Sequence, residues 1–467
     1  MVVHSGIEKR PSPRTALSIE QPVTERGTSI PRSLRVVAGL ACGLLVLIAA
    51  AAREFLNASP SAALTSKAAP QDVSAFVQSF GINSHLSYPG TPYHGQPQRV
   101  ISALQYLGIN TIRDQSPAYI DDRSTVAANH AVAAAGIRFD ALIPGSGPVN
   151  IVGSLANITA FAHADPGAMA AIEGPNEIND GRITYAGETN IYHAGMQITR
   201  TLWAAVQSNS TLSGVPVYAL TLSNGIPGVL SGARELGDLA PFVTYGNAHV
   251  YACCSNNVWQ NDMPYWLPVF QQATAGKPTV ITETGYPTVP SNVDEIAAAK
   301  YNLNTFFENA QHGIARTYLY ELVDMNSSSS DTNAEDHFGE FHDDWTPKAG
   351  ATAIHNLTSI LRRVGTGAPS NLLNYGVTGL PATGHTFLLG SSTAFAIAVW
   401  IDATVYDRKN AKDIAAPAYP ATVSLDRNYA AIVVYDPMIG DRPIAAYSNV
   451  SKLTMSVTDH PVIVQVK

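Results

Sequence analysis

Cysteine and charge are both scarce in this 467-residue sequence, which has three cysteines and 14% charged residues. The cysteines lack the spacing of zinc ligands, which excludes a cysteine-based zinc site. Cys42 lies in an apolar run. The adjacent Cys253 and Cys254 could be two thiols or could form a vicinal disulfide, and the sequence does not decide between these states. A net charge of -8 provides no basic surface for phosphates, so we expect no nucleic-acid partner and a neutral or weakly charged ligand.

A glycine-rich phosphate-binding turn is also missing. The first strand-like segment is followed by the residues Ser87-Tyr88-Pro89-Gly90, which do not form a dinucleotide fingerprint. We therefore expect no organic cofactor, and no metal.

The N-terminal part carries a targeting pattern. Residues 1–34 are rich in Pro, Ser, Thr and Arg and are predicted to be a disordered tail. Residues 35–56 contain an uninterrupted apolar run after several arginines, which is typical of a transmembrane signal anchor or a cleaved signal peptide. A buried core helix is the alternative. After a linker at 57–71, we expect the chain to face the periplasm or exterior, anchored in the inner membrane or secreted.

Residues 72–363 alternate between short strand-like runs and helical segments. Eight glycine-punctuated strand–helix units favour a closed (β/α)8 TIM barrel of the α/β class over an open sheet. One predicted helix spans Asn292–Gln311, with Ser291 as its N-cap. The strand-like runs are Phe80–Tyr88, Ile109–Gln115, Ile137–Gly145, Met169–Ile178, Val215–Asn224, Val243–Tyr251, Lys277–Tyr286 and Ala315–Met325.

Residues 364–467 show a different pattern. Short alternating apolar runs are separated by turn residues such as Asp441-Arg442-Pro443. This pattern predicts a small C-terminal antiparallel β-sandwich.

Two glutamates stand where chemistry is expected in such a barrel. Glu177 closes the fourth run and Glu283 the seventh, and the carboxyl ends of barrel strands form the active site. Two carboxylates facing one pocket are what glycosidic cleavage needs, because one protonates the leaving oxygen while the other stabilises or attacks the sugar carbon. Rim glutamates paired with Arg or Lys are the structural alternative.

The Asn176-Glu177 pair, with a second glutamate ending strand seven, resembles the clan A glycoside hydrolases, which are retaining enzymes. The C-terminal β-domain makes family 39 and its relatives the most similar branch. The resemblance implies that Glu177 is the acid/base, Asn176 binds the sugar 2-hydroxyl and Glu283 is the nucleophile. It also implies carboxyl groups about 5 to 5.5 Å apart.

Three further positions match the clan pattern. Arg113 corresponds to the arginine that keeps the nucleophile ionised, and His249 and Tyr251 correspond to the His and Tyr beside it. Ordinary structural roles at the barrel mouth stay open for all three.

Strand eight departs from the clan. Many members have tryptophan there, whereas this chain has Tyr320-Glu321-Leu322-Val323-Asp324. Glu321 is a candidate for binding sugar hydroxyls or for a structural pair. Weaker sugar-binding candidates are Trp259, Trp266, Tyr286, Asn83 and His85.

The predicted function is a monomeric, exported, retaining glycoside hydrolase that cleaves a poly- or oligosaccharide through a covalent glycosyl-enzyme intermediate. Two alternatives stay open. One is a non-catalytic carbohydrate-binding barrel. The other is a transglycosylase, or a processing enzyme for an exopolysaccharide.

Overall fold

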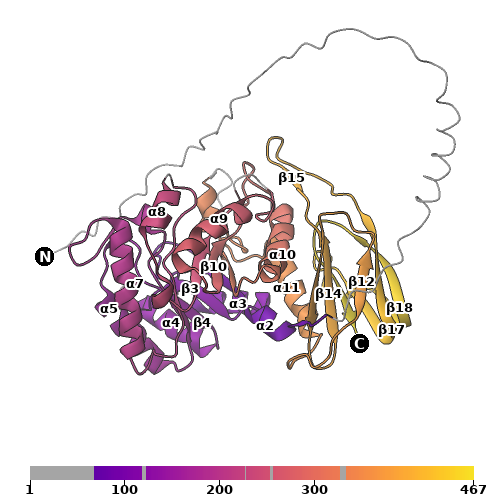
Figure 1. Ribbon diagram of the computed structural model, residues 1–467, viewed down its shortest axis with the longest axis horizontal. Helices are drawn as coiled ribbons and strands as arrows, with labels where there is room; N and C mark the ends of the chain where they lie inside the picture. The colour runs from indigo at the N-terminus through magenta and orange to yellow at the C-terminus, as the bar shows by residue number, and fades with distance from the viewer. Residues whose placement is uncertain (1–67, 118–122, 227, 253–255, 327–332) are drawn as a thin grey trace, which may run out of the picture. The chain divides into compact units, whose positions relative to one another are not determined.

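The computed structural model describes residues 68–117, 123–226, 228–252, 256–326 and 333–467. The described residues belong to one compact unit, in which a parallel barrel precedes a mostly antiparallel β-domain (Figure 1). The predicted tail, the apolar segment 35–56 and the two adjacent cysteines lie outside the described residues. Among those that are described, no helix combines the length and the apolar character needed to cross a bilayer.

Within the described residues, eight parallel strands form the barrel, in the order β8-β6-β4-β3-β2-β11-β10-β9. A parallel bridge between Tyr218 and Tyr245 joins the two ends of this order. Each predicted run contains one strand, which confirms the (β/α)8 fold. The strands are β2 (Phe80–Asn83), β3 (Thr111–Gln115), β4 (Arg138–Leu142), β6 (Met169–Glu173), β8 (Val217–Tyr218), β9 (Gly246–His249), β10 (Thr279–Thr284) and β11 (Thr317–Leu319).

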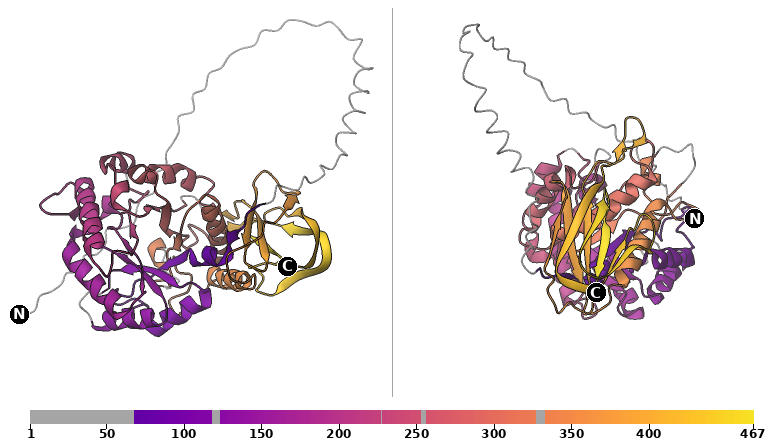
Figure 2. Two further views of the ribbon diagram at one scale, coloured as in Figure 1. Left: turned by 60° about the horizontal axis from the view of Figure 1, so that its bottom comes forward. Right: turned by 90° about the vertical axis from the view of Figure 1, so that its right-hand side faces the viewer.

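Helices between the strands cover the outside of the barrel (Figures 1 and 2). α3 ends at Gly108, whose φ of 72° is a left-handed conformation that glycine adopts without strain. The long helix of the second half begins later than predicted, because Asp294 and not Ser291 accepts the hydrogen bond from Ala297 N. The helices are α2 (Val73–Gln78), α3 (Pro97–Leu107), α4 (Arg123–Ala134), α5 (Ile151–Ala164), α6 (Ile178–Gly181), α7 (Ile191–Ser208), α8 (Val229–Glu235), α9 (Asp262–Gln271), α10 (Glu295–Gln311), α11 (Ala349–Arg362) and the short η1 (Ala240–Phe242), η2 (Gln272–Thr274) and η3 (Ala334–Asp336).

The C-terminal β-domain is one continuous sheet in the order β1-β13-β14-β19-β17-β12, with β18 added on β17. Before the chain enters the barrel, β1 joins this sheet in parallel with β13, so the domain also contains residues just before position 73. Figure 2 shows its strands side by side. The strands are β1 (Gln71–Asp72), β12 (Tyr375–Thr378), β13 (Gly384–Gly390), β14 (Phe395–Ile401), β17 (Tyr419–Tyr435), β18 (Pro443–Val457) and β19 (Val462–Val466); β5 (Gly147–Pro148), β7 (Ile183–Thr184), β15 (Tyr406–Asp407) and β16 (Lys412–Asp413) form small pairs elsewhere.

β14 is buried on both faces. Its side chains alternate, as they do in any strand. Ile397, Val399 and Ile401 pack into the core of the β-domain, while Ala398 and Trp400 pack into the main core shared with the barrel. The two parts of the chain are therefore held together by apolar contact along a central strand.

A buried charged chain adds to this contact. His460 lies between Asp459, at 2.7 Å, and Asp436, at 3.0 Å. Asp459 also accepts a hydrogen bond from Lys300 Nζ on α10 at 2.9 Å. The loop before β19 is thereby bound to the barrel through alternating charges.

This arrangement predicts a pH dependence of stability. Burial lowers the pKa of His460, but the bonds and charges of Asp436 and Asp459 outweigh burial and raise this pKa to about 9. A raised pKa in the folded state stabilises the protein below about pH 6.5, and that stabilisation is lost as the pH rises through about 9. Between pH 6 and pH 10, we expect the wild type to lose about 3 kcal/mol more of its free energy of unfolding than His460→Asn.

Urea titrations at the two pH values measure this difference. His193→Asn, an exposed histidine on α7, is the control and should follow the wild type. Parallel pH dependence in the wild type and His460→Asn would contradict a charged His460.

Candidate active site

The predicted site residues converge at the carboxyl ends of the barrel strands. Glu283 lies near the end of β10, Glu177 follows β6, and His249 ends β9. Arg113 in β3 and Tyr251 after β9 complete the group. The structure thus brings together residues that are up to 170 positions apart in the sequence.

Glu283 is held by three neighbours. Arg113 Nη1 donates to its Oε1 at 2.5 Å, and the Tyr251 hydroxyl donates to its Oε2 at 2.7 Å. His249 Nδ1 is 3.4 Å from the same Oε2. Burial raises the pKa of Glu283, but His249, Arg113 and Tyr251 outweigh burial and bring this pKa below its usual value. The carboxylate is therefore ionised and fixed in direction, as a nucleophile must be.

Arg113 is the centre of the network. Besides Glu283, its guanidinium donates to Glu173 through Nε at 3.0 Å and Nη2 at 2.7 Å. It also donates to Asn83 Oδ1 at 2.9 Å and to Asn176 Oδ1 at 2.7 Å. Burial lowers the pKa of Arg113, but Glu173 and Glu283 raise it above its usual value, so the cation persists. With Oδ1 of Asn176 engaged, this amide would use its Nδ2 toward a sugar hydroxyl.

Glu177 differs from Glu283 in its surroundings. Its side chain is 18% exposed against 9% for Glu283, and its nearest polar side chain is His249, with Nδ1 at 3.3 Å. Its backbone has a left-handed conformation at φ 36°, which costs a non-glycine residue about 1 kcal/mol. Its N–H donates to Thr221 Oγ1 at 2.9 Å. This local strain turns the side chain of Glu177 into the mouth, next to His249.

The two carboxylates are close together. One oxygen of Glu177, one oxygen of Glu283 and a ring nitrogen of His249 all lie within 4.8 Å of one another. This closest approach of the two carboxylates is compatible with the spacing of about 5 to 5.5 Å that is typical of retaining glycosidases. The same three residues have the right types for a metal ion, but both oxygens of Glu283 already accept hydrogen bonds from Arg113 and Tyr251.

Glu321 lies one layer deeper than the two catalytic candidates. It has no exposed surface, and its Oε2 accepts from the Tyr93 hydroxyl at 2.9 Å. His85 Nε2 is 3.2 Å from the same oxygen, and the His85 side chain keeps 12% exposure. Of this pair, only His85 is therefore accessible from outside. Asp114 fixes the backbone around His85 by accepting from Leu86 N at 3.0 Å.

Glu173 is the important residue that the sequence interpretation missed. It is fully buried inside the barrel and forms two bonds with Arg113. Its signal in the sequence is an acidic residue within the apolar run Met169–Glu173, a placement that is costly without a partner. Thr282 is the second missed residue, because its hydroxyl lies 3.0 Å from His249 Nε2 and 2.9 Å from Asn247 Oδ1.

The three aromatic residues proposed as sugar platforms have other partners. Trp259 stacks on His312 at 3.7 Å between ring centroids, and Trp266 stacks on Phe270. Tyr286 is 3% exposed, and its hydroxyl accepts from Val258 N. These contacts account for all three side chains as packing within the protein, which is the more frequent role of aromatic residues in loops.

Other aromatic side chains stand beside the nucleophile. Tyr320, at the end of strand eight, makes edge contacts with Tyr251 at 6.4 Å and with Phe338 at 5.4 Å between centroids. Tyr88 stacks on His85 at 4.4 Å. Tyr320 therefore stands where the clan pattern has tryptophan.

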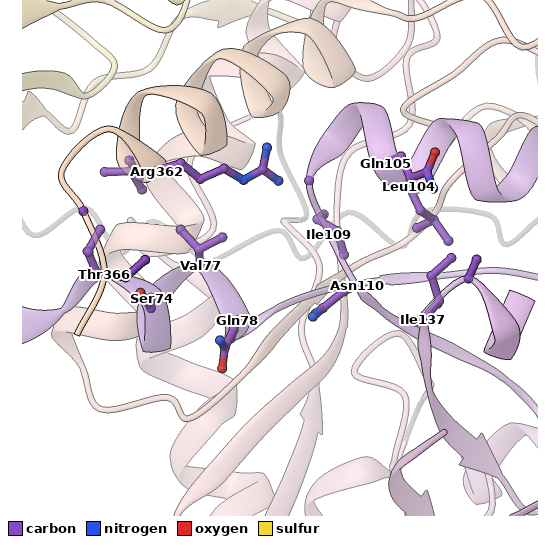
Figure 3. Close-up of a pocket in the computed structure, with 16 residues that line it drawn as sticks. Ser74, Val77, Gln78, Leu104, Gln105, Ile109, Asn110, Ile137, Arg362 and Thr366 are labelled. Atoms are coloured by element: carbon purple, nitrogen blue, oxygen red, sulfur yellow. The ribbon is translucent and has the colours of Figure 1, made fainter. Parts of the chain in front are cut away.

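A cavity of about 420 Å³ lies away from this site (Figure 3). Its lining includes Asn110 just before β3 and Ile137 just before β4, so it opens at the amino ends of the strands. Arg362, at the end of α11, extends across it. None of the catalytic candidates lines this cavity, and barrel chemistry belongs to the opposite end.

Neither a protein-family model nor a curated protein matches the sequence. Solved structures do match. A family 39 glycoside hydrolase from Bacteroides cellulosilyticus WH2 has a TM-score of 0.57 at 14% identity, over 85% of this chain and 83% of that chain. A monomeric beta-xylosidase from Caulobacter crescentus CB15 has a TM-score of 0.56 at 15% identity, over 86% of this chain and 97% of that chain. A glucosidase from Croceicoccus marinus has a TM-score of 0.51 at 10% identity, over 79% of this chain and 91% of that chain.

At these identities the similarity shows the fold. The chain is similar in fold to these glycoside hydrolases, and one of the similar structures belongs to family 39. The resemblance read from the sequence motifs is confirmed at this level.

The bond from Tyr251 to Glu283 can be tested without a substrate. Tyr251→Phe removes a hydrogen bond to a charged group, which is worth about 1.5 to 3 kcal/mol. We expect the pKa of Glu283 to rise, as measured by carbon NMR of labelled glutamate carboxyls and assigned with Glu283→Gln. Tyr245→Phe, at the opposite end of the barrel, is the matched control. An unchanged titration of Glu283 in Tyr251→Phe would refute the assigned bond.

Proposed function

We propose that this protein is a retaining glycoside hydrolase that acts on a poly- or oligosaccharide. The observation that carries the proposal is the pair of carboxylates with oxygens within 4.8 Å, of which Glu283 is kept ionised. The fold of the similar structures supports a glycoside hydrolase, and two of them are described as a beta-xylosidase and a glucosidase. The sequence before residue 57 is the reason to expect the substrate outside the cytoplasm.

The first chemical step uses both glutamates. The Glu283 carboxylate attacks the anomeric carbon while Glu177 donates its proton to the leaving glycosidic oxygen, so the bond to that oxygen breaks as the Glu283 ester forms. Arg113 and Tyr251 hold Glu283 in place before the attack. As the negative charge leaves Glu283, the salt bridge to Arg113 weakens, and the bonds from Arg113 to Glu173 keep the guanidinium in position.

The second step reverses the roles. Glu177, now a carboxylate, takes a proton from water, and the resulting hydroxide equivalent attacks the anomeric carbon and releases Glu283. The greater exposure of Glu177 suits this role, because it must exchange protons with leaving group and water in turn. His249 lies close to both carboxylates and helps to hold Glu283 and Glu177 on opposite sides of the scissile bond, as attack by one and protonation by the other require.

Substitutions separate the two roles. We expect Glu283→Gln to abolish turnover on every substrate. Glu177→Gln should slow unactivated glycosides by about 10²- to 10⁴-fold, the usual worth of general acid catalysis. It should spare the first step on aryl glycosides, whose leaving groups need no proton. A screen over glycans and aryl glycosides, followed by burst kinetics on the best substrate, measures both.

Glu235→Gln, an exposed carboxylate on α8, is the control and should keep wild-type rates. Full activity in Glu283→Gln or in Glu177→Gln on unactivated glycosides would refute the assignment. A wild type that binds glycans without cleaving them would favour a carbohydrate-binding barrel, and product transfer to an added sugar acceptor would favour a transglycosylase.

A further inference from the structure

A short arm leaves the C-terminal sheet between β14 and β17. We call residues 402–414 the arm; it contains the β15–β16 hairpin and lies beside α10 in Figure 1. Ile414 N donates to Val405 O at 2.8 Å and closes its base. The β15 and β16 strands of the arm pair only with each other and are not part of the seven-stranded sheet.

The arm contacts the segment that follows the nucleophile. Val405 N donates to the Tyr301 hydroxyl on α10 at 2.9 Å. The Tyr301 ring lies 5.0 Å from the ring of Tyr286, which is three residues after Glu283 in the chain. Val405, Tyr301 and Tyr286 are each at most 3% exposed and form one buried cluster. The cluster therefore connects the arm to the loop that begins at the end of β10.

The same arm contacts the segment that follows Tyr251. Gln260 donates to Asp402 Oδ1 at 3.0 Å and accepts from Thr404 Oγ1 at 3.2 Å. The Tyr286 hydroxyl accepts from Val258 N at 2.8 Å, and Ala252, next to Tyr251, packs against the buried cluster. Each partner of the Glu283–Tyr251 hydrogen bond is thus followed by a segment that is linked to the arm, directly through Gln260 or indirectly through Tyr301.

A second contact fixes the base of this junction. Asn257 donates to both carboxyl oxygens of Glu308 on α10, at 2.9 and 3.0 Å. Trp400, two residues before the arm, donates to the same carboxyl group at 3.2 Å. Three segments that are distant in the sequence therefore meet at one buried side chain.

We propose that the arm is a positioning element for the catalytic loops, which holds the segments after β9 and β10 so that Tyr251 and Glu283 keep their geometry. This inference rests on the proposed hydrolase function. The physical reason is that catalytic groups must be held to within about 0.5 Å, and irregular loops are the segments most prone to local opening. The C-terminal β-domain then contributes to the site without providing a residue that touches the sugar.

Tyr301→Phe tests the proposal in the full chain. This substitution leaves the buried Val405 N–H without its acceptor. Because such a loss destabilises the closed state, we expect the equilibrium constant for local opening to rise about tenfold. We expect amide hydrogen exchange to become about tenfold faster in residues 256–262 and 285–294. On a substrate found by the glycan screen, we expect kcat to fall about tenfold while KM changes less than twofold.

Two further variants make the test specific. Tyr435→Phe removes the hydroxyl of another buried tyrosine in the β-domain, one that bonds Gln465 and not the arm, and should change neither exchange in these loops nor kcat. Thr404→Val removes an exposed contact, so we expect this variant to fold like the wild type. It should speed exchange in residues 256–262 alone.

The outcomes are distinguishable. Unchanged exchange in both loops of Tyr301→Phe overturns the proposal, and so does faster exchange with unchanged kcat, because the arm would then stabilise without positioning. If the wild type cleaves no glycan, the hydrolase function fails, while hydrogen exchange still decides whether the arm holds the loops.

Discussion

One buried cation organises this site. Arg113 binds the nucleophile candidate Glu283, the buried Glu173 and the amide oxygens of Asn83 and Asn176 at the same time. A guanidinium suits this task because its five N–H donors lie in one plane and stay charged at any relevant pH. An unpaired charge at this depth would be prohibitive, so the four acceptors and the cation must be assembled together. The barrel supplies them from the ends of β2, β6 and β10, of which only β2 is paired with the strand of Arg113, so the closure of the sheet is a condition for this network.

The sequence was sufficient for the barrel and for the prediction that Glu177 and Glu283 come together at its mouth, because both depend on local signals. Short apolar runs bounded by turn residues mark the barrel strands, and an acidic residue at the end of such a run marks a strand end facing the mouth. Glu177 and Glu283 satisfy this rule. Glu173 was missed because nothing local shows that its partner is an arginine 60 positions earlier. The N-cap at Asp294 was misplaced by three residues for a similar reason, since nearby polar side chains compete for the same role.

Aromatic side chains were the least predictable class. In the sequence, Tyr286 looks like an aromatic residue that could stack on a sugar ring. In the structure its ring is buried against Tyr301, and its hydroxyl accepts a hydrogen bond from a backbone N–H. Only tertiary contacts decide such cases, and here they come from α10 and from the segment before α9. Trp400 illustrates the same point, because it connects the sheet to Glu308 on α10. The domain that appeared in the sequence as a separate module is thus packed into the support of the site.

The central claim is that Glu283 attacks the sugar directly, and the anomeric configuration of the first product tests it most directly. Proton NMR of a hydrolysis reaction, recorded before mutarotation, shows which anomer is released first. The carboxylate separation observed here predicts that the product keeps the configuration of the substrate. Release of the inverted anomer would contradict a covalent intermediate on Glu283 and the mechanism built on Arg113.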